Sequence, residues 1–240
     1  MNEIKEQFYN ALIVDDRWKW LFEGFRLTII ITFFAALLGS LIGIIISAIR
    51  STYDKNYDNL KRRGGFSYYA LKVLNFISNI YVTVIRGTPV VVQLMIMYFI
   101  IMQDTNNSLL IAILAFGINS GAYVAEIYRS GIMSIDNGQF EAGRSLGFTY
   151  GQTMFHIIIP QMFKVVLPTL INEFISLLKE TSVAGYVGII DLTKQGDIIR
   201  GLTFTAFPPL ISVAAIYLVT VIILTRIEKV VEKRLRSSER

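Results

Sequence analysis

Five long apolar stretches follow one another along the chain. A helix needs about 20 predominantly apolar residues to cross a bilayer, because every backbone polar group there must be satisfied within the segment. In the first stretch, Gly39 and Gly43 have the spacing that lets two helices approach closely. The pattern predicts an all-α integral membrane protein with five transmembrane helices, at residues 27–49, 73–102, 105–125, 150–178 and 202–225.

The second stretch is too long for one minimal span. Its only charged residue is Arg86, and Gly87 and Pro89 come directly afterwards. Because a glycine and a proline this close together disturb helix regularity, we expect a bend. We predict one helix that begins obliquely at the cytosolic interface and becomes transmembrane near Ile85. Arg86 then either snorkels to the cytosolic end of this span or has a gating or packing role.

Basic residues distinguish the two sides of the membrane. Five spans put the two termini on opposite sides of the membrane. The segments on the same side as the C-terminus hold fourteen Lys and Arg residues, and the segments on the side of the N-terminus hold seven. Because cytosolic loops are enriched in Lys and Arg, we expect the N-terminus outside and the C-terminus in the cytosol. No signal peptide is recognised. We divide the chain into an extracytoplasmic segment (1–24), a transmembrane domain (25–232) with a polar cytosolic loop (55–68) and a helical external excursion (183–201), and a cytosolic tail (233–240).

Composition narrows the possible functions. The chain is 53% hydrophobic and 17% charged, which is typical of a protein that faces lipid. It has no cysteine and one histidine, His156, so neither a thiolate site nor a histidine metal cluster is expected. The net charge of +5 comes from residues that flank apolar stretches, which argues against a nucleic-acid partner. No convincing catalytic cluster is present, so we do not expect an enzyme.

A loop between the third and fourth spans has strong helix signals. Asp136 is an N-cap candidate with Gln139 three residues later, and Gly147 soon stops the helix that would follow. Thr149 and Gln152 then have the spacing of a capping box before an apolar run. We predict a two-turn helix, a sharp turn and then the fourth span. Such a loop is either an ordinary helical connection or a rigid cytosolic element, with docking side chains at Phe140, Leu146 and Phe148.

The same loop resembles that of a known family. Residues 139–147 (QFEAGRSLG), followed by Ile157, Ile159 and Pro160, are similar to the Glu-Ala-Ala loop of ATP-binding-cassette (ABC) importer permeases. The spacing from Glu141 to Pro160 matches throughout. Gly143 stands where the family has Ala, and Ile159 where it has Leu. Gly143 should weaken the short helix by about 1 kcal/mol relative to Ala.

Three further segments resemble the polar amino-acid branch of these permeases, namely Arg86-Gly87-Thr88-Pro89, the run from Ala122 to Ile132, and Asn172-Glu173-Phe174 with Lys179. The resemblance implies a type I importer core in a bacterial inner or plasma membrane, paired with a second permease chain, an extracellular amino-acid-binding protein and ABC ATPase subunits. The chain contains no phosphate-binding loop, so ATP and Mg would be bound by the partner ATPase and no cofactor by this chain.

The resemblance also implies roles for individual residues. The short cytosolic helix of the 136–150 loop would couple to the ATPase through Gln139, Glu141, Ala142, Gly143, Leu146 and Gly147. Arg86, Gly87, Pro89 and Pro160 would have structural or gating roles.

Buried polarity predicts the substrate path. Uncompensated charge at bilayer depth costs about 2.5 kcal/mol or more, so polar helix faces should line a dimer interface or a hydrated pathway. Steps of three and four residues place Asn172, Ser176 and Lys179 on one face of the fourth span, and Asn119 and Glu126 on one face of the third. Glu173 is a candidate to attract a cationic amino group. The alternatives are a Glu126–Arg129 ion pair near the cytosolic end and a Lys179 that snorkels outward.

Two other function classes fit hydropathy alone. A secondary transporter usually needs more spans and an internal repeat, and neither is seen here. An accessory membrane subunit that is not coupled to an ATPase is the other possibility. The spacing from Glu141 to Pro160 separates these classes, because only an importer has reason to place it on the cytosolic face. The sequence identifies neither the amino acid carried nor whether the two permease chains are identical.

Overall fold

The computed structural model describes residues 2–237, and within them every regular element is helical. The elements are α1 (Asn2–Phe8), η1 (Tyr9–Ile13), η2 (Val14–Asp16), α2 (Arg17–Arg63), α3 (Phe66–Gly87), α4 (Val90–Ile96), η3 (Met97–Ile101), α5 (Ser108–Ser134), α6 (Asn137–Ser145), α7 (Tyr150–Thr153), η4 (Met154–Ile158), α8 (Ile159–Glu180), η5 (Thr181–Val187), α9 (Leu192–Thr203) and α10 (Phe207–Ser237).

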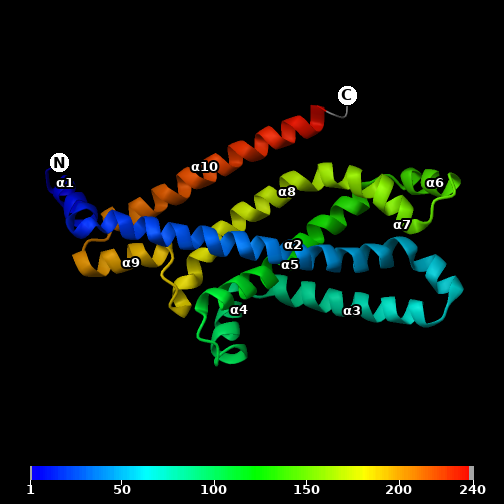
Figure 1. The fold of residues 1–240 in the computed structure, drawn as a ribbon, viewed down its shortest axis with the longest axis horizontal. Coiled ribbons are helices and arrows are strands. Elements are labelled where there is room, and N and C mark those ends of the chain that lie inside the picture. The colour runs from blue at the N-terminus through cyan, green and yellow to red at the C-terminus, as the bar shows by residue number, and fades with distance from the viewer. Residues whose placement is uncertain (1, 238–240) are drawn as a thin grey trace. The chain divides into compact units, whose positions relative to one another are not determined.

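Five helical segments in the described part of the chain are long and apolar enough to cross a membrane. They contain α2, α3, α5, α8 and α10, and Figure 1 follows them from the blue α2 to the red α10. The predicted fold class, an all-α membrane protein with five spanning helices, is confirmed.

The second apolar stretch differs from the prediction. The expected bend is a complete break, because α3 ends at Gly87 and α4 begins at Val90 after an extended Thr88. Pro89 explains the break, since proline lacks an N–H donor and disfavours helical backbone at the preceding residue. The candidate span is Phe66–Gly87 alone, and Val90–Ile101 is a shorter apolar helix, so the prediction of one helix reaching residue 102 is wrong.

The polar loop expected at 55–68 is also wrong, because α2 continues as a helix to Arg63. Only Gly64 and Gly65 leave the helical conformation, with φ of +64° and +83°, values that glycine adopts without steric cost. Across this turn Tyr57 and Tyr68 face each other, with ring centroids 6.0 Å apart. The segment is therefore a tight helical hairpin.

The chain forms two compact units, each described here by itself. The first comprises residues up to Leu37, Pro89–Gly117 and Phe174–Ile227. One of its cores includes Ile31, Leu94, Phe116 and Leu177, and a second gathers Ala11, Leu21, Leu192, Ile199 and Val213. The predicted helical excursion at 183–201 is present as η5 and α9.

In the first unit, α9 begins at the fully buried Asp191. Its carboxylate accepts hydrogen bonds from the backbone N–H groups of Thr193 and Lys194, at 3.1 and 3.0 Å. The Leu192 N–H donates to the Thr28 hydroxyl at 3.2 Å, which ties α9 to α2. Burial raises the pKa of Asp191 above its ordinary value, and the two N–H donors oppose that rise.

The second unit comprises Leu38–Thr88, Ile118–Glu173 and the residues from Glu228 onward. Its helices pack closely because of small residues. A Cβ atom on Gly43 of α2 would lie 2.8 Å from Cβ of Val124 on α5, and one on Gly121 would lie 2.9 Å from Ile42. The close approach expected at Gly43 is thus confirmed, and it brings α2 beside α5. The core of this unit contains Val124, Tyr128, Phe140, Ile158 and Val166.

Candidate functional site

The loop from α5 to α8 has the predicted helix, turn and helix. Asp136 caps α6 by accepting a hydrogen bond from the Gly138 N–H at 2.6 Å. Gly147 ends the turn with φ of +81°, a conformation that favours glycine. Thr149 and Gln152 form the complete capping box of α7. The Gln139 side chain differs from the expected pattern, because it accepts a hydrogen bond from Gln161 at 3.3 Å rather than returning to the N-cap.

The two faces of α6 have different surroundings. Gln139, Glu141 and Ala142 are exposed, and Leu146, just beyond the last turn of α6, is 73% exposed. Phe140 and Gly143 are buried on the other face, where Phe140 joins the core of the second unit. The expectation that Phe140 is available for docking is therefore wrong, because an aromatic ring on the inward face packs against the core. The exposed face with Leu146 remains open to a partner.

Gly143 explains how α6 packs against α7. A Cβ atom at this position would lie 2.7 Å from both Oγ1 and Cγ2 of Thr153, and 3.2 Å from Cδ1 of Ile157. The family resemblance has Ala here, and Thr153 makes that residue a poor fit in this chain. Gly143 is a packing requirement as well as a source of lower helix propensity.

The C-terminal part of α2 contacts the start of α6 through Lys55. The Lys55 ammonium donates a hydrogen bond to the Asn137 side-chain oxygen at 2.7 Å. The same Nζ lies 4.8 Å from the centre of the Phe140 ring, within the range of a cation–π interaction. This contact was not predicted, since 82 residues separate Lys55 from Asn137.

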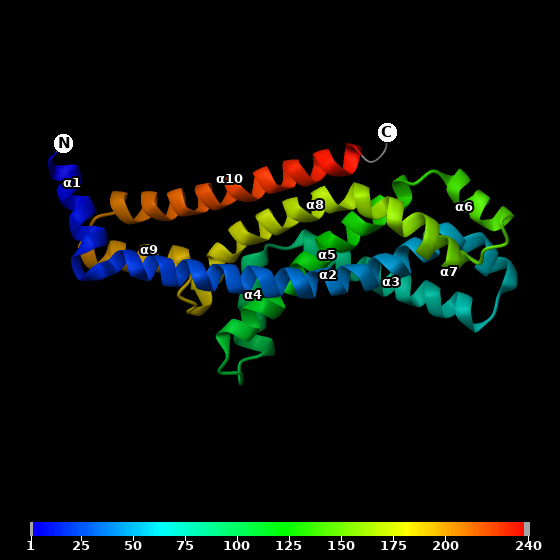
Figure 2. The ribbon, with the colours of Figure 1, turned by 45° about the horizontal axis from the view of Figure 1, so that its top comes forward.

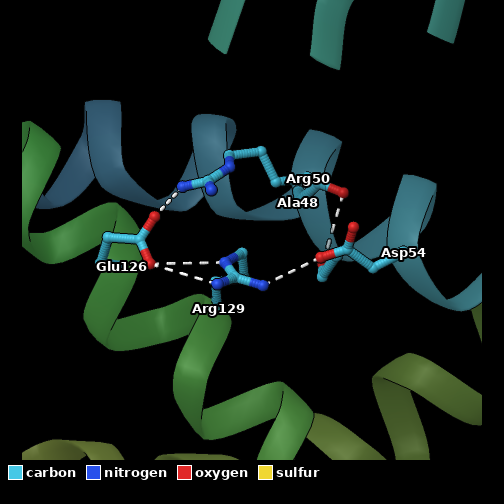
Figure 3. Close-up of polar contacts among 6 residues, drawn as sticks. Ala48, Arg50, Asp54, Glu126 and Arg129 are labelled. Carbon is cyan, nitrogen blue, oxygen red and sulfur yellow. Dashed lines mark hydrogen bonds and ion pairs between the residues drawn. The ribbon is translucent and has the colours of Figure 1, made fainter. Parts of the chain in front are cut away.

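Four charged residues join α2 to α5 in the second unit (Figure 3). Glu126 pairs with Arg50 and, at 3.4 Å, with Arg129. Arg129 also reaches Asp54 at 3.0 Å, so the carboxylates and guanidinium groups alternate. The four side chains are between 13% and 33% exposed, where ion pairs are screened less than in water. The predicted Glu126–Arg129 pair is confirmed, and Arg50 and Asp54 extend it.

A polar cavity of about 400 Å³ lies in the same unit. Its charged lining consists of Arg86, Glu126 and Glu173, with Tyr123 and Thr169 among the other lining residues. Glu173 accepts a hydrogen bond from the Ser120 hydroxyl at 2.8 Å. The Arg86 guanidinium lies 5.2 Å from the centre of the Tyr123 ring. The lining of the cavity therefore includes one cationic side chain and two carboxylates.

The structure places the predicted path residues in several environments. Glu126 and Glu173 line the cavity, and so does Arg86. Asn119 is buried and 2% exposed, and it is not among the lining residues. Asn172 is exposed and donates to Glu228 on α10. Ser176 and Lys179 belong to the first unit, where Ser176 is half-buried and Lys179 is exposed. The predicted helix faces are thus only partly gathered at one site.

Three predicted structural residues lie at helix breaks or on the surface. Gly87 ends α3, Pro89 precedes α4, and Pro160 is the second residue of α8, directly after the π-helical turn η4. Among residues 2–237, no group of three or more His, Cys, Asp or Glu side chains is arranged to hold a metal ion.

Residues 62–237 match a family described as "binding-protein-dependent transport system inner membrane component". The chain is 41% identical over 167 residues to the arginine transport system permease protein ArtQ of Bacillus subtilis, covering 68% of this chain and 76% of the relative. It is 36% identical over 167 residues to a putative glutamine transport system permease protein of Rickettsia prowazekii, covering 68% and 77%.

Solved structures agree with these relatives. A crystal structure of an amino acid ABC transporter with histidines matches with a TM-score of 0.79 and 36% identity, covering 92% of this chain and 96% of that one. An inward-facing MetNI methionine ABC transporter has a TM-score of 0.73 at 20% identity, covering 90% and 96%, which supports the fold.

This chain belongs to the family of binding-protein-dependent transport system inner membrane components. It is a multi-pass membrane permease subunit of an ABC importer, a transport protein rather than an enzyme.

Proposed function

We propose that this permease takes up a polar amino acid that an extracellular binding protein delivers, with ATP hydrolysed by a separate ABC ATPase. The observation that carries this proposal is the α6–turn–α7 element. Its capped, two-turn helix exposes one face while Phe140 and Gly143 anchor the other. A rigid element of this kind transmits a push from a partner into α8, because α7, η4 and α8 follow one another without a break.

In this proposal the exposed face of α6 contacts the ATPase through Gln139, Glu141, Ala142 and Leu146, while Gly143 and Gly147 maintain the shape of the element. ATP and Mg are bound by the ATPase. The permease works as a pair with a second permease chain. The family description, which names a binding protein, supports that partner, and the ABC transporters among the solved structures support an ATPase.

The proposed topology follows the distribution of basic residues. The N-terminal segment, residues 1–24, lies outside, the permease domain spans 25–232, and residues 233–240 are a cytosolic tail. This arrangement puts α6 and the extended end of α2 in the cytosol, and α9 on the outer face. The excess of Lys and Arg in the segments assigned to the cytosol supports it.

The cavity of the second unit is the proposed substrate-contact region. An α-amino acid carries an ammonium and a carboxylate, and the cavity offers Glu173 to the first and Arg86 to the second. Glu126 is held by Arg50 and Arg129, whereas Glu173 accepts a hydrogen bond from the Ser120 hydroxyl, so Glu173 is the carboxylate proposed to contact the ligand. The relatives named for arginine and glutamine transport support an amino acid as the substrate class.

Two measurements test this function. The chain is purified with its ATPase, and single amino acids are added with the binding protein. We expect a polar amino acid to stimulate ATP hydrolysis, and the absence of any ATPase in the purified complex would contradict the proposal. A Glu173→Gln variant should then weaken the stimulation by every amino acid tested, because each carries the α-ammonium that Glu173 is proposed to contact. Ser120→Ala is its control, because it removes the hydrogen bond to Glu173 and keeps the charge.

A further inference from the structure

The joint between α5 and α6 consists of two residues. α5 ends at Ser134 and α6 begins at Asn137, and Asp136 between them has an extended backbone with ψ of 137°. A few residues at the end of an element are enough to act as a hinge, because they absorb changes in φ and ψ. A push on the exposed face of α6 would therefore be lost as rotation at this joint unless another contact opposed it.

Lys55 of α2 supplies such a contact, and it holds α6 at two points. Its Nζ donates a hydrogen bond to the side-chain oxygen of Asn137 at 2.7 Å and lies 4.8 Å from the centre of the Phe140 ring. Asn137 is the first residue of α6, and the buried Phe140 follows about one turn later. Lys55 itself is half-buried. One ammonium group thus joins both the polar start and the inward face of α6 to α2.

The helix that carries Lys55 is a firm support, because it packs tightly on α5. Buried residues with small side chains recur at every fourth position of α2, at Gly39, Gly43, Ser47 and Ser51. This spacing places them on one face of the helix. A Cβ atom on Gly43 would lie 2.5 Å from Cγ1 of Val124 on α5, so no space is left between the two helices there. Figures 1 and 2 both show the C-terminal end of α2 and α6 at the same end of the second unit.

Ion pairs continue the packing of α2 on α5 as far as Lys55. Arg50 pairs with Glu126, and Asp54 lies 3.0 Å from Arg129. Lys55 follows Asp54 directly in the sequence. Consecutive residues of a helix point about 100° apart, which lets Asp54 contact α5 while Lys55 contacts α6. The contact of α2 with α6 therefore begins where its ion pairs with α5 end.

The polar cavity takes lining residues from both helices that flank the coupling element. Tyr123 and Glu126 come from α5, and Thr169 and Glu173 come from α8. α8 follows α6 through α7 and η4, whereas α5 is joined to α6 by the two-residue joint. A contact that holds α6 at a fixed angle to α5 would pass a push to both sets of lining residues.

We infer that Lys55 is a positioning residue for transport, which fixes the angle between α6 and α5 so that a push on α6 moves the cavity residues of α5 together with those of α8. This inference rests on the proposed function, because it requires an ATPase that acts on α6. Without the Lys55 contact, part of each push is absorbed at the Asp136 joint. The amount of amino acid transported per ATP should then fall, while ATP hydrolysis continues.

The test measures the ratio of amino acid transported to ATP hydrolysed in proteoliposomes that hold the permease and its ATPase, with the binding protein added. The amino acid is the one that most stimulates hydrolysis by the wild-type complex. Lys55→Met keeps a long side chain without the charge and should lower the ratio at least twofold, and Asn137→Ala, which removes the acceptor, should lower it too. Lys55→Arg keeps a cation with N–H donors and should retain most of the wild-type ratio. The matched control is Lys61→Met, because the ring beside Lys61 belongs to Tyr57 of the same helix.

The outcomes separate this inference from the proposed function. Lower ratios in both single variants, with no further loss when Asn137→Ala is added to Lys55→Met, support the inference, because both substitutions then remove one contact. An unchanged ratio in either single variant, or additive losses in the double variant, would overturn it. A parallel fall of uptake and hydrolysis at a constant ratio would also overturn it, since poor folding or poor docking has that effect. A wild-type complex without ATP-driven uptake would contradict the proposed function itself.

Discussion

Arg50 on α2 and Glu126 on α5 form an ion pair across 76 residues of sequence. Glu126 also lines the polar cavity, and Lys55, about one and a half turns after Arg50, holds the start of α6. Within the second unit, a continuous set of contacts thus leads from the proposed substrate region to the proposed coupling element. A substitution at Glu126 should therefore affect both the proposed substrate region and the proposed coupling element.

A Glu126→Gln variant should be less stable than the wild type by about 2 kcal/mol, because two part-buried guanidinium groups lose a shared charged acceptor. Thermal unfolding in detergent measures this loss. The control is Asp54→Asn, which removes the charge from the more exposed ion pair with Arg129 and should cost less than about 1 kcal/mol. Equal unfolding temperatures for Glu126→Gln and the wild type would argue that the network is only a surface feature.

A Gly143→Ala variant should be destabilised despite the better helix propensity of alanine. The new methyl group meets Thr153 at 2.7 Å, and overpacking of this kind costs about 1–3 kcal/mol, against about 1 kcal/mol gained in propensity. Adding Thr153→Ala removes both colliding atoms and should restore most of the loss. The double-mutant cycle over these two positions measures the coupling directly, and additive effects would show that the predicted collision does not occur.

A Gly147→Asp variant should reach the membrane yet separate ATP hydrolysis from uptake. The backbone at Gly147 has φ of +81°, so a side chain there strains the turn that joins α6 to α7. The ratio of amino acid transported to ATP hydrolysed, measured in proteoliposomes, should fall. Gly147→Asn isolates the added charge, because Asn tolerates this backbone region better and has a similar size. Normal uptake by Gly147→Asp would count against a coupling role for this turn.

Stability should depend on pH through Asp191. Burial raises the folded-state pKa of this carboxyl above its ordinary value of 3.8. Its contribution to stability is therefore fully present below pH 3.8 and is lost as pH rises through the raised pKa. Asp191→Asn keeps a good N-cap for α9 and does not titrate. The stability of the variant minus that of the wild type should grow with pH over this interval. Parallel unfolding curves across the interval would contradict the assignment.

The sequence predicted local features far better than distant contacts. The helix, turn and helix of residues 136–153 follow from caps that lie three residues apart, so Asp136, Gly147 and Thr149 were all identified from the chain itself. The five spans follow from hydropathy. Arg50, Asp54 and Lys55 were missed as partners because their contacts depend on which helices lie side by side. One signal for this was Gly43, whose lack of a side chain permits α2 to approach α5.

Two errors have plain physical causes. Residues 55–62 are polar but contain no glycine or proline, so α2 continues as a helix where polarity alone suggests a loop. Phe140 lies in a loop that the sequence predicts to be exposed, yet the inner face of α6 places its ring in the core of the second unit. Predicting this would have required knowing which face of α6 meets α7 and η4.

The central claim is that α6 lies in the cytosol, where an ATPase can push on it. The chain has no cysteine, so a single Leu146→Cys substitution gives one reactive site at a position that is 73% exposed. Phe204→Cys, at a position that is 95% exposed after α9, is the matched site that the proposed topology assigns to the outer side. A membrane-impermeant maleimide added to intact cells should label residue 204 alone and should label residue 146 only after the membrane is opened. Labelling of residue 146 from outside intact cells would contradict the account.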